Sequence, residues 1–366
     1  MTNTMMALPK LMRAAQVVAF NEPYQIREVP VPSELQPHDV LIKVAVASNC
    51  HTDFNVIRGN WNTKLPCTGS HEGAGTIVAI GSAISHLAIG DRVMGGMLVH
   101  PCGTCHDCTG PETNRQYCAK MEGYNGVTAD GFYAEYVRTD GNHTVKLPDQ
   151  IGFVDASPLA CAGRTVWRAI LQTELGEGQT LAIIGSGGGL GHLAIQFAKG
   201  RGLNVIGIDI RDEGLEISRQ SDADWVVDAR DGKHAVVKMV QAVTGGNGAD
   251  STMTLSFARD STALACAVTR MHGTVIQVAE PDVVEIPPDE LVFRDIRIRS
   301  TLIASGEESK DMLDFVAKNG IHVKTNLFYG LDGIFDLVRE AHTSKMTGKA
   351  CLVIDEDLVK ADEVIG

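Results

Sequence analysis

The sequence predicts an α/β fold in which a parallel, doubly wound sheet follows a β-rich first part. From Thr180 onward, apolar runs rich in Val and Ile alternate with helical patterns. The preceding part, up to about residue 165, carries short β-branched runs and few helical patterns. A glycine-rich run, Gly185 to Gly191, follows one apolar strand and opens a helix. Repeated β-α-β units with apolar strands are typical of a parallel sheet with right-handed crossovers.

The individual elements follow from these patterns. The expected strands are 40–47, 75–80, 181–184, 204–209, 225–228, 250–255 and 274–278. The expected helices between the later strands are 188–199, 213–220, 233–243 and 261–270. Beyond about Ser300, two further helices (309–318 and 331–342) and two strands (322–327 and 350–354) could extend the parallel sheet or return to the first part. The acidic stretch 355–362 is interpreted as a solvated tail.

Length and composition exclude several classes of function. A chain of 366 residues predicts about two domains. A net charge of −13 without basic runs argues against binding to nucleic acid or to anionic membranes. Neither a signal peptide nor a run of eighteen apolar residues is visible, which predicts a soluble protein. Nine cysteines, an odd number in metal-type spacing, favour reduced thiols and a cytoplasmic location.

The glycine-rich run predicts a dinucleotide site. Glycines allow the backbone to approach a pyrophosphate, and the helix N-terminus offers unpaired N–H groups to it. An acidic residue, Asp209, ends the second strand, where it can accept hydrogen bonds from ribose hydroxyls. A carboxylate there repels a 2′-phosphate, so NAD is preferred to NADP, although Arg211 could contact a phosphate. The expected cofactor-binding residues of the turn are Gly185, Gly187, Gly188, Gly189, Leu190 and Gly191.

Four clustered cysteines predict a closed metal site. They are Cys102, Cys105, Cys108 and Cys118. Four thiolates complete a tetrahedral zinc site that stabilises structure. The alternatives are a set of inert buried thiols and a nucleic-acid zinc knuckle, and the acidic charge of the chain argues against the latter. His106 lies within this lobe and is interpreted as a surface residue, because the cysteines already supply four ligands.

Three separate residues, Cys50, His71 and Cys161, predict a second and open metal site. Each is weak evidence alone, since a lone Cys or His is more often a packed core residue. Together with a dinucleotide fold they match a three-ligand catalytic zinc, which keeps one position open for an alcohol oxygen. The sequence therefore predicts two zinc ions per chain with different roles.

These motifs occur in an order that resembles a known family. They are Cys50-His51-Thr52-Asp53, Ser70-His71-Glu72-Gly73, the four-cysteine lobe, Leu159-Ala160-Cys161-Ala162-Gly163 and Gly188-Gly189-Leu190-Gly191. From about Met12 to Asp355 the chain resembles the zinc-dependent medium-chain dehydrogenase/reductases, and most closely the yeast-type alcohol dehydrogenases. The resemblance implies a GroES-like catalytic domain over residues 1–165 and 303–366, with a Rossmann domain over 166–302. It also implies a homo-oligomer, a tetramer or a dimer.

The resemblance further implies roles for single residues. Cys50, His71 and Cys161 would bind catalytic zinc, with Glu72 beside it as a transient ligand or a supporting carboxylate. Thr52 would take the alcohol proton, and His51 would lie near the cofactor pyrophosphate. By the same resemblance, Asp53 would hydrogen-bond the ligand His71. Lys349 would lie near the cofactor. For Lys349, a surface position is the alternative.

The chain also departs from the family pattern. Asn55 stands where the proton relay often ends in His, so the relay is expected to be shorter. Met97 stands where yeast-type enzymes carry a pocket Trp, so the pocket is expected to accept bulkier substrates. Trp61 could line that pocket or belong to the core. Four remaining residues are expected to be structural: His192 as a packing residue or a solvent cap, and Cys67, Cys266 and Cys351 as buried or incidental thiols.

The predicted function is reversible hydride transfer between an alcohol and NAD, with a small alcohol or carbonyl compound as substrate. Two alternatives remain open at this stage. One is a dehydrogenase or reductase of the same fold that acts on a bulkier metabolite. The other is a non-redox protein that keeps the zinc scaffold, against which the intact set of Cys50, Thr52, His71 and Cys161 counts.

Overall fold

The predicted parallel sheet is present and has six strands in the order β13-β12-β11-β14-β15-β16. A computed structural model describes residues 8–341, 343 and 346–363. The strands are β11 (Thr180–Ile184), β12 (Asn204–Asp209), β13 (Trp225–Asp228), β14 (Ala249–Thr254), β15 (Thr269–Gln277) and β16 (Arg297–Ser300). All neighbours are parallel. The sequence analysis missed β16, because this exposed edge strand is mostly polar.

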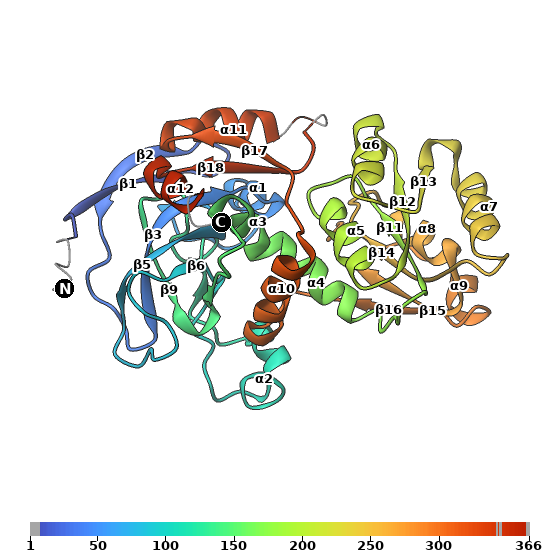
Figure 1. Cartoon of the computed structure of the whole chain (residues 1–366), viewed down its shortest axis with the longest axis horizontal. Coiled ribbons are helices and arrows are strands. Elements are labelled where there is room, and N and C mark those ends of the chain that lie inside the picture. The colour runs from blue at the N-terminus through green and yellow to red at the C-terminus, as the bar shows by residue number, and fades with distance from the viewer. Residues whose placement is uncertain (1–7, 342, 344–345, 364–366) are drawn as a thin grey trace.

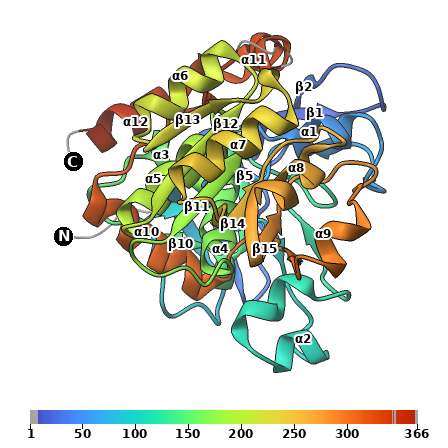
Figure 2. The same cartoon turned by 90° about the vertical axis from the view of Figure 1, so that its right-hand side faces the viewer.

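Helices cover both faces of this sheet (Figure 2). They are α4 (Arg164–Leu171), α5 (Gly191–Gly200), α6 (Asp212–Gln220), α7 (Lys233–Val243), α8 (Ser261–Val268) and α9 (Pro288–Val292). Residues of α4 and α5 share one apolar core with Leu181 and Ile183, whereas residues of α7 and α8 share another with Ala182 and Ile184. This alternation is what a strand with two buried faces requires.

The first part of the chain forms antiparallel sheets (Figure 1). The larger sheet has the order β10-β6-β5-β3-β18-β17, and β9 also pairs with β3. Its strands are β3 (Asp39–Ser48), β5 (Glu72–Ile80), β6 (Arg92–Met94), β9 (Tyr136–Asp140), β10 (Val145–Lys146), β17 (Thr325–Tyr329) and β18 (Lys349–Val353). One smaller sheet contains β1 (Leu11–Val17), β2 (Gln25–Pro30) and β4 (Cys67–Thr68). Another contains β7 (Leu98–Val99) and β8 (Gly123–Tyr124).

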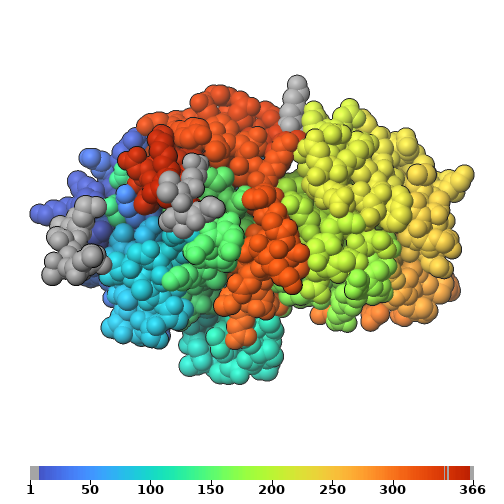
Figure 3. Space-filling model, in the orientation of Figure 1, coloured from blue at the N-terminus to red at the C-terminus, as the bar shows by residue number. Residues whose placement is uncertain are grey.

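The C-terminal strands return to this first sheet, which settles the alternative that the sequence left open. β18 pairs antiparallel with β3, and β17 pairs parallel with β18. Before them, α10 (Gly306–Asn319) lies in the seam between the two halves of the molecule, as Figure 3 shows. Met312 and Leu313 of α10 belong to the same apolar core as Val46 of β3 and Leu181 of β11. One continuous core therefore fixes the two halves relative to each other.

The remaining helices are α1 (His51–Ile57), α2 (His106–Thr109), α3 (Phe153–Pro158), α11 (Ile334–Ala341) and α12 (Glu356–Glu363). The expected helix 331–342 is a 3₁₀ turn, Leu331–Gly333, followed by α11, and His342 lies outside the described residues. The sequence analysis missed α3 and α4, because Pro158 and Gly163 interrupt their helical pattern. In the described part of the chain, no helix combines the length and apolar character that a membrane span needs.

The interpretation of residues 355–362 as a solvated tail is wrong. They form most of α12, and Asp362 is buried against the body of the protein. Its carboxylate accepts a hydrogen bond from the Phe153 backbone N–H at 2.7 Å and pairs with the Arg92 side chain. The acidic composition concealed this contact, because both partners lie far away in the sequence.

Replacing Asp362 with Ala should therefore destabilise the protein. The substitution leaves Arg92, whose side chain is largely buried, without its carboxylate, and breaking such a pair costs about 3 kcal/mol of unfolding free energy. Urea denaturation would measure the loss. Asp357→Ala on the same helix is the matched control, because Asp357 is exposed and surface substitutions usually change stability by less than about 0.5 kcal/mol. Equal stability of the two variants would contradict this account of α12.

Candidate active site

The first ligand turn begins where β3 ends. Cys50 is the N-cap of α1, a position where backbone N–H groups favour a thiolate. The Asp53 carboxylate accepts hydrogen bonds from the N–H of Cys50 at 2.8 Å and from the N–H of Ser70 at 3.0 Å. These bonds correct the expectation that Asp53 hydrogen-bonds His71. Asp53 instead joins the backbones of the two ligand turns.

The second ligand turn is held in an unusual backbone conformation. Ser70 has a φ of 66°, which a residue with a side chain rarely adopts. Its hydroxyl donates to the carbonyl oxygens of Ser48 and Glu72, at 2.9 and 3.0 Å. Strain of this kind persists where surrounding bonds impose it, often at functional sites. Here it directs His71 into the protein interior, where the side chain is buried.

The third ligand comes from a π-helical turn. Cys161 lies within Leu159–Gly163, which joins α3 to α4. Such wide turns are rare and occur frequently at functional sites. Just before it, the Ser157 hydroxyl lies 3.1 Å from the Ser48 hydroxyl, so the α3 end is tied to β3. Three turns from distant parts of the sequence thus meet at one point.

The ligand atoms of Cys50, His71, Glu72 and Cys161 all lie within 4.8 Å of one another. Both ring nitrogens of His71 are buried and, among the described residues, have no hydrogen-bond partner. Buried polar atoms normally have partners, so these orphaned nitrogens indicate a missing one. Two sulfurs and an imidazole match the ligand set of a catalytic zinc, and the residues therefore fit the metal.

The electrostatics of the cluster also suit a cation. The pKa of the Cys50 thiol lies well below its usual value, chiefly through a hydrogen bond with Cys161 and also through the nearby charges of His71 and Lys349. Burial lowers the pKa of His71, but the negative charges of Cys50, Asp53 and Glu72 outweigh burial and raise it to about 9. The cluster thus attracts positive charge, and a bound metal would displace the His71 proton.

Glu72 is tied to Lys349 in a buried ion pair. The Lys349 ammonium lies 2.8 Å from Glu72 Oε1 and donates to the Asn49 carbonyl at 2.6 Å. The Ser48 hydroxyl donates to the other oxygen of Glu72. Burial raises the pKa of Glu72 to about 7, against the opposing charge of Lys349. The alternative of a surface position for Lys349 is wrong, since its side chain is 5 % exposed.

Lys349 also contacts the glycine-rich turn. A Cβ atom at Gly189 would lie 2.9 Å from Lys349 Cδ, too close for a side chain. Similarly, a Cβ at Gly187 would lie 2.1 Å from the Gly214 Cα. The turn is therefore packed against α6 and against Lys349, which pairs with Glu72 of the cluster. The helix begins at Gly191 rather than at 188, because Gly188, Gly189 and Leu190 form the turn.

Asp209 lies at the end of β12 and faces the same turn. Its carboxylate accepts a hydrogen bond from the Gly187 N–H at 3.0 Å and from the N–H groups of Ile210 and Arg211. The Arg211 guanidinium lies 3.4 Å from the same carboxylate. Asp209 therefore lies at the edge of the glycine turn and also fixes its backbone through the Gly187 N–H.

His192 is a packing residue, as expected, with a specific role that the sequence analysis missed. One ring nitrogen lies 3.1 Å from the Gly188 carbonyl, and the other accepts from the Lys324 N–H at 3.1 Å. Burial lowers its pKa to about 4, so the ring is neutral. His192 thus links the start of α5 to the segment before β17. In the sequence, the i, i+4 spacing of Gly188 and His192 is the feature that could have indicated the contact between them.

Of the proposed relay residues, Thr52 contacts the cluster. The Thr52 hydroxyl lies 3.8 Å from the Cys50 sulfur, and His51 is exposed. The side chain of Asn55 is bonded to a neighbour on its own turn, because its amide oxygen accepts a hydrogen bond from the side-chain amide of Asn60. Met97 is half-buried against the core of the first part. Trp61 is 38 % exposed and belongs to none of the buried cores of the described residues, so the core alternative is wrong.

The four cysteines of the second cluster also meet. Their sulfurs lie within 4.8 Å of one another, with Cys102 to Cys108 at 4.0 Å and Cys105 to Cys118 at 3.7 Å. A tetrahedral centre with Zn–S bonds of about 2.3 Å separates its sulfurs by about 3.8 Å. The lobe therefore has the dimensions of a zinc site. His106 is exposed, and Cys67, Cys266 and Cys351 are buried free thiols, all as expected.

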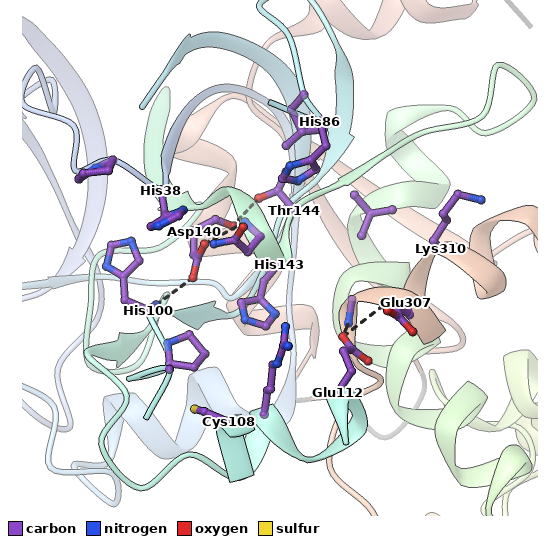
Figure 4. A pocket seen from close by; sticks show the side chains of 18 of the residues that line it. His38, His86, His100, Cys108, Glu112, Asp140, His143, Thr144, Glu307 and Lys310 are labelled. Atoms are coloured by element: carbon purple, nitrogen blue, oxygen red, sulfur yellow. Dashed lines mark hydrogen bonds between the residues drawn. The ribbon is translucent and has the colours of Figure 1, made fainter. Parts of the chain in front are cut away.

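A cavity of about 990 Å³ lies beside this lobe, and none of the residues of the first cluster lines it (Figure 4). Four histidines line it, namely His38, His86, His100 and His143. His100 lies between the carboxylates of Asp39 and Glu122, and these outweigh burial and raise its pKa. The mixture of carboxylates and histidines selects no ligand class.

Comparison with known proteins identifies the family. Residues 36–149 match the alcohol dehydrogenase GroES-like domain, and residues 189–318 match the zinc-binding dehydrogenase domain. An alcohol dehydrogenase of Geobacillus stearothermophilus is 33 % identical over 94 % of this chain and 100 % of its own length. The chain belongs to the zinc-dependent medium-chain dehydrogenase/reductases. Alcohol–carbonyl oxidoreduction is the activity that this membership supports, and the predicted fold class is confirmed.

Two further relatives agree with this assignment. An alcohol dehydrogenase of Schizosaccharomyces pombe is 30 % identical over 95 % of this chain and 99 % of its own length. The crystal structure of the alcohol dehydrogenase of Aeropyrum pernix superposes with a TM-score of 0.84 at 29 % identity, covering 93 % of this chain and 99 % of that one. The likeness thus extends over both halves of the protein.

The two clusters predict different responses to loss of a ligand. Cys161→Ala should remove about one zinc equivalent of two and abolish activity, while the fold persists, because the turn is held by other contacts. Cys108→Ser should remove the other equivalent and destabilise the lobe, because such sites contribute about 10–16 kcal/mol of apparent binding energy. Elemental analysis and circular dichroism would measure both effects. Cys67→Ser is the control, since Cys67 lies outside both clusters, and an equal loss of zinc in this variant would refute the assignment.

Proposed function

We propose that this chain is a zinc-dependent, NAD-linked alcohol dehydrogenase. The observation that carries the proposal is a cluster of two half-buried cysteines and a buried histidine that Lys349 links to a glycine-rich turn. Lys349 contacts both, through Glu72 on one side and Gly189 on the other. A hydride acceptor bound at the turn would therefore lie next to a substrate oxygen at the cluster.

Each residue near the cluster has a task in this proposal. Cys50, His71 and Cys161 would hold zinc, which when bound acts as a Lewis acid and makes an alcohol oxygen more acidic. The Thr52 hydroxyl accepts the alcohol proton. Because Asn55 is bonded to Asn60 and cannot relay a proton, the proton leaves through His51 or water. Glu72 stands beside the ligands as a supporting carboxylate or transient ligand.

The cofactor in this proposal is NAD. The pyrophosphate would bind at the glycine turn and the N-terminus of α5, with the His51 ring near it. The Asp209 carboxylate meets the ribose hydroxyls and disfavours a 2′-phosphate. Supporting this choice, the Arg211 guanidinium pairs with the Asp209 carboxylate, and this negative charge offsets the attraction of Arg211 for a phosphate. Two zinc ions per chain complete the proposed cofactor set.

The proposal extends to the domain division and the assembly of the protein. Residues 1–165 and 303–366 would form the catalytic domain and 166–302 the dinucleotide domain, a division supported by the end of β16 at Ser300. We also propose a cytoplasmic homo-oligomer, a tetramer or a dimer. Supporting this, the consecutive apolar residues Leu291, Val292 and Phe293 lie just before the edge strand β16 and are 41 %, 72 % and 74 % exposed, and adjoining exposed apolar side chains can mark an interaction site.

An alcohol panel tests the proposed activity. With NAD, wild-type enzyme should produce NADH from small primary alcohols, and the initial rate should depend on bound zinc. Turnover of bulky alcohols alone would favour the alternative of a larger metabolite, which Met97 suggests by being smaller than Trp. Absence of hydride transfer with every alcohol and carbonyl compound tested would refute the proposal and favour a non-redox scaffold.

Asp209→Asn should change the cofactor preference. The amide oxygen can still accept from the Gly187 N–H, but the negative charge that repels a 2′-phosphate is lost. We expect the ratio of kcat/KM with NAD to that with NADP to fall about tenfold, which corresponds to about 1.4 kcal/mol. Asp212→Asn is the control, because Asp212 is exposed and pairs with Arg230 instead. An unchanged ratio for Asp209→Asn would contradict the role of the carboxylate.

A further inference from the structure

The two halves of the molecule touch through an aromatic pair beside the metal cluster. The His51 imidazole and the Phe257 ring have centroids 4.4 Å apart and planes inclined by 31°. His51 opens α1 next to Cys50, whereas Phe257 lies in the loop between β14 and α8. Phe257 is nevertheless 48 % exposed, so its ring is not buried in either half.

The topology places Phe257 at the mouth of the dinucleotide crevice. The chain runs outward from β11 to β12 and β13, and then returns to β14 on the other side of β11. Dinucleotides bind where the strand order reverses, at the carboxyl ends of the strands. The Leu255 N–H donates to the Ile184 carbonyl at 2.9 Å, so the loop that carries Phe257 starts directly beside the glycine-rich turn.

The pair is therefore positioned to act on a bound cofactor. A dinucleotide that runs from the glycine turn toward the metal cluster passes from one half of the protein to the other, and His51 and Phe257 come from opposite sides of that passage. Stacking restricts the rotation of an exposed imidazole and so lowers the conformational entropy lost when the ring meets an anion. The edge of Phe54 contacts the same imidazole at 6.1 Å between centroids.

We propose that Phe257 is a positioning residue for cofactor binding: it holds the His51 ring at the crevice, where the ring meets the anionic bridge of a nicotinamide dinucleotide. The inference rests on the proposed function, because it requires that the crevice binds such a cofactor. Phe257 acts through His51 and takes no part in the transfer of the proton or the hydride. Its effect therefore belongs to cofactor affinity and depends on the presence of the imidazole.

A double-substitution cycle tests this dependence. The dissociation constant for NADH would be measured by calorimetry with zinc-loaded wild type, Phe257→Ala, His51→Ala and the double variant. We expect Phe257→Ala to weaken binding roughly 2- to 12-fold, the range for loss of one aromatic contact. In the His51→Ala background the same change should have little further effect. Phe257→Tyr, which keeps the ring, should restore most of the affinity.

Two controls separate this role from a structural one. Phe335→Ala removes an aromatic ring that is 47 % exposed on α11, outside the crevice, and should leave the dissociation constant unchanged. For Phe257→Ala, the KM for the alcohol at saturating NAD should change by less than about twofold, since the contribution is to cofactor binding alone.

The outcomes distinguish the inference from the function on which it rests. If wild type binds NADH but Phe257→Ala binds it equally well, or if the two substitutions act additively, the positioning role is refuted while the proposed function stands. If wild type binds neither NADH nor NADPH, the proposed function fails, and the positioning role fails with it.

Discussion

The buried ion pair between Glu72 and Lys349 is the interaction on which the arrangement of the site depends. It joins β5 to β18, the last strand of the chain, and through Gly189 it reaches the glycine-rich turn. Removing two charges from water costs several kcal/mol per ion, and the loss is offset only when every lone pair and proton has a partner. Here Ser48 and Asn49 supply those partners. The cluster, the returning strand and the nucleotide turn are thereby held in one geometry.

Contacts of the surrounding backbone bring the ligand residues of the metal cluster together. Asp53 bonds the turns of Cys50 and Ser70 together, and a π-helical turn presents Cys161. These contacts hold the ligand atoms close to one another. The negative charges of Cys50, Asp53 and Glu72 raise the pKa of His71, so the cluster favours a cation.

Local patterns predicted the parts of the fold whose causes are local. The apolar runs of β11 and β12 identified the parallel sheet, because both faces of those strands are buried. Cysteine spacing identified the four-thiolate lobe, because its four ligands lie close together in the sequence. By contrast, the buried role of Asp362, the contact of Phe257 with His51 and the bonds of Asp53 depend on partners far away in the sequence, and no periodicity reports them. Asp53 was assigned by resemblance, and its carboxylate proved to be occupied by two backbone N–H groups.

Zinc K-edge X-ray absorption on the purified enzyme tests the central claim most directly, namely that two zinc sites of different composition coexist. A four-sulfur site and a two-sulfur site average to about three sulfurs per zinc at about 2.3 Å, with a shorter nitrogen and oxygen shell at about 2.0–2.1 Å. The account predicts this mixed spectrum. Four sulfurs per zinc without a nitrogen or oxygen shell would show that the cluster of Cys50, His71 and Cys161 holds no metal, and would contradict it.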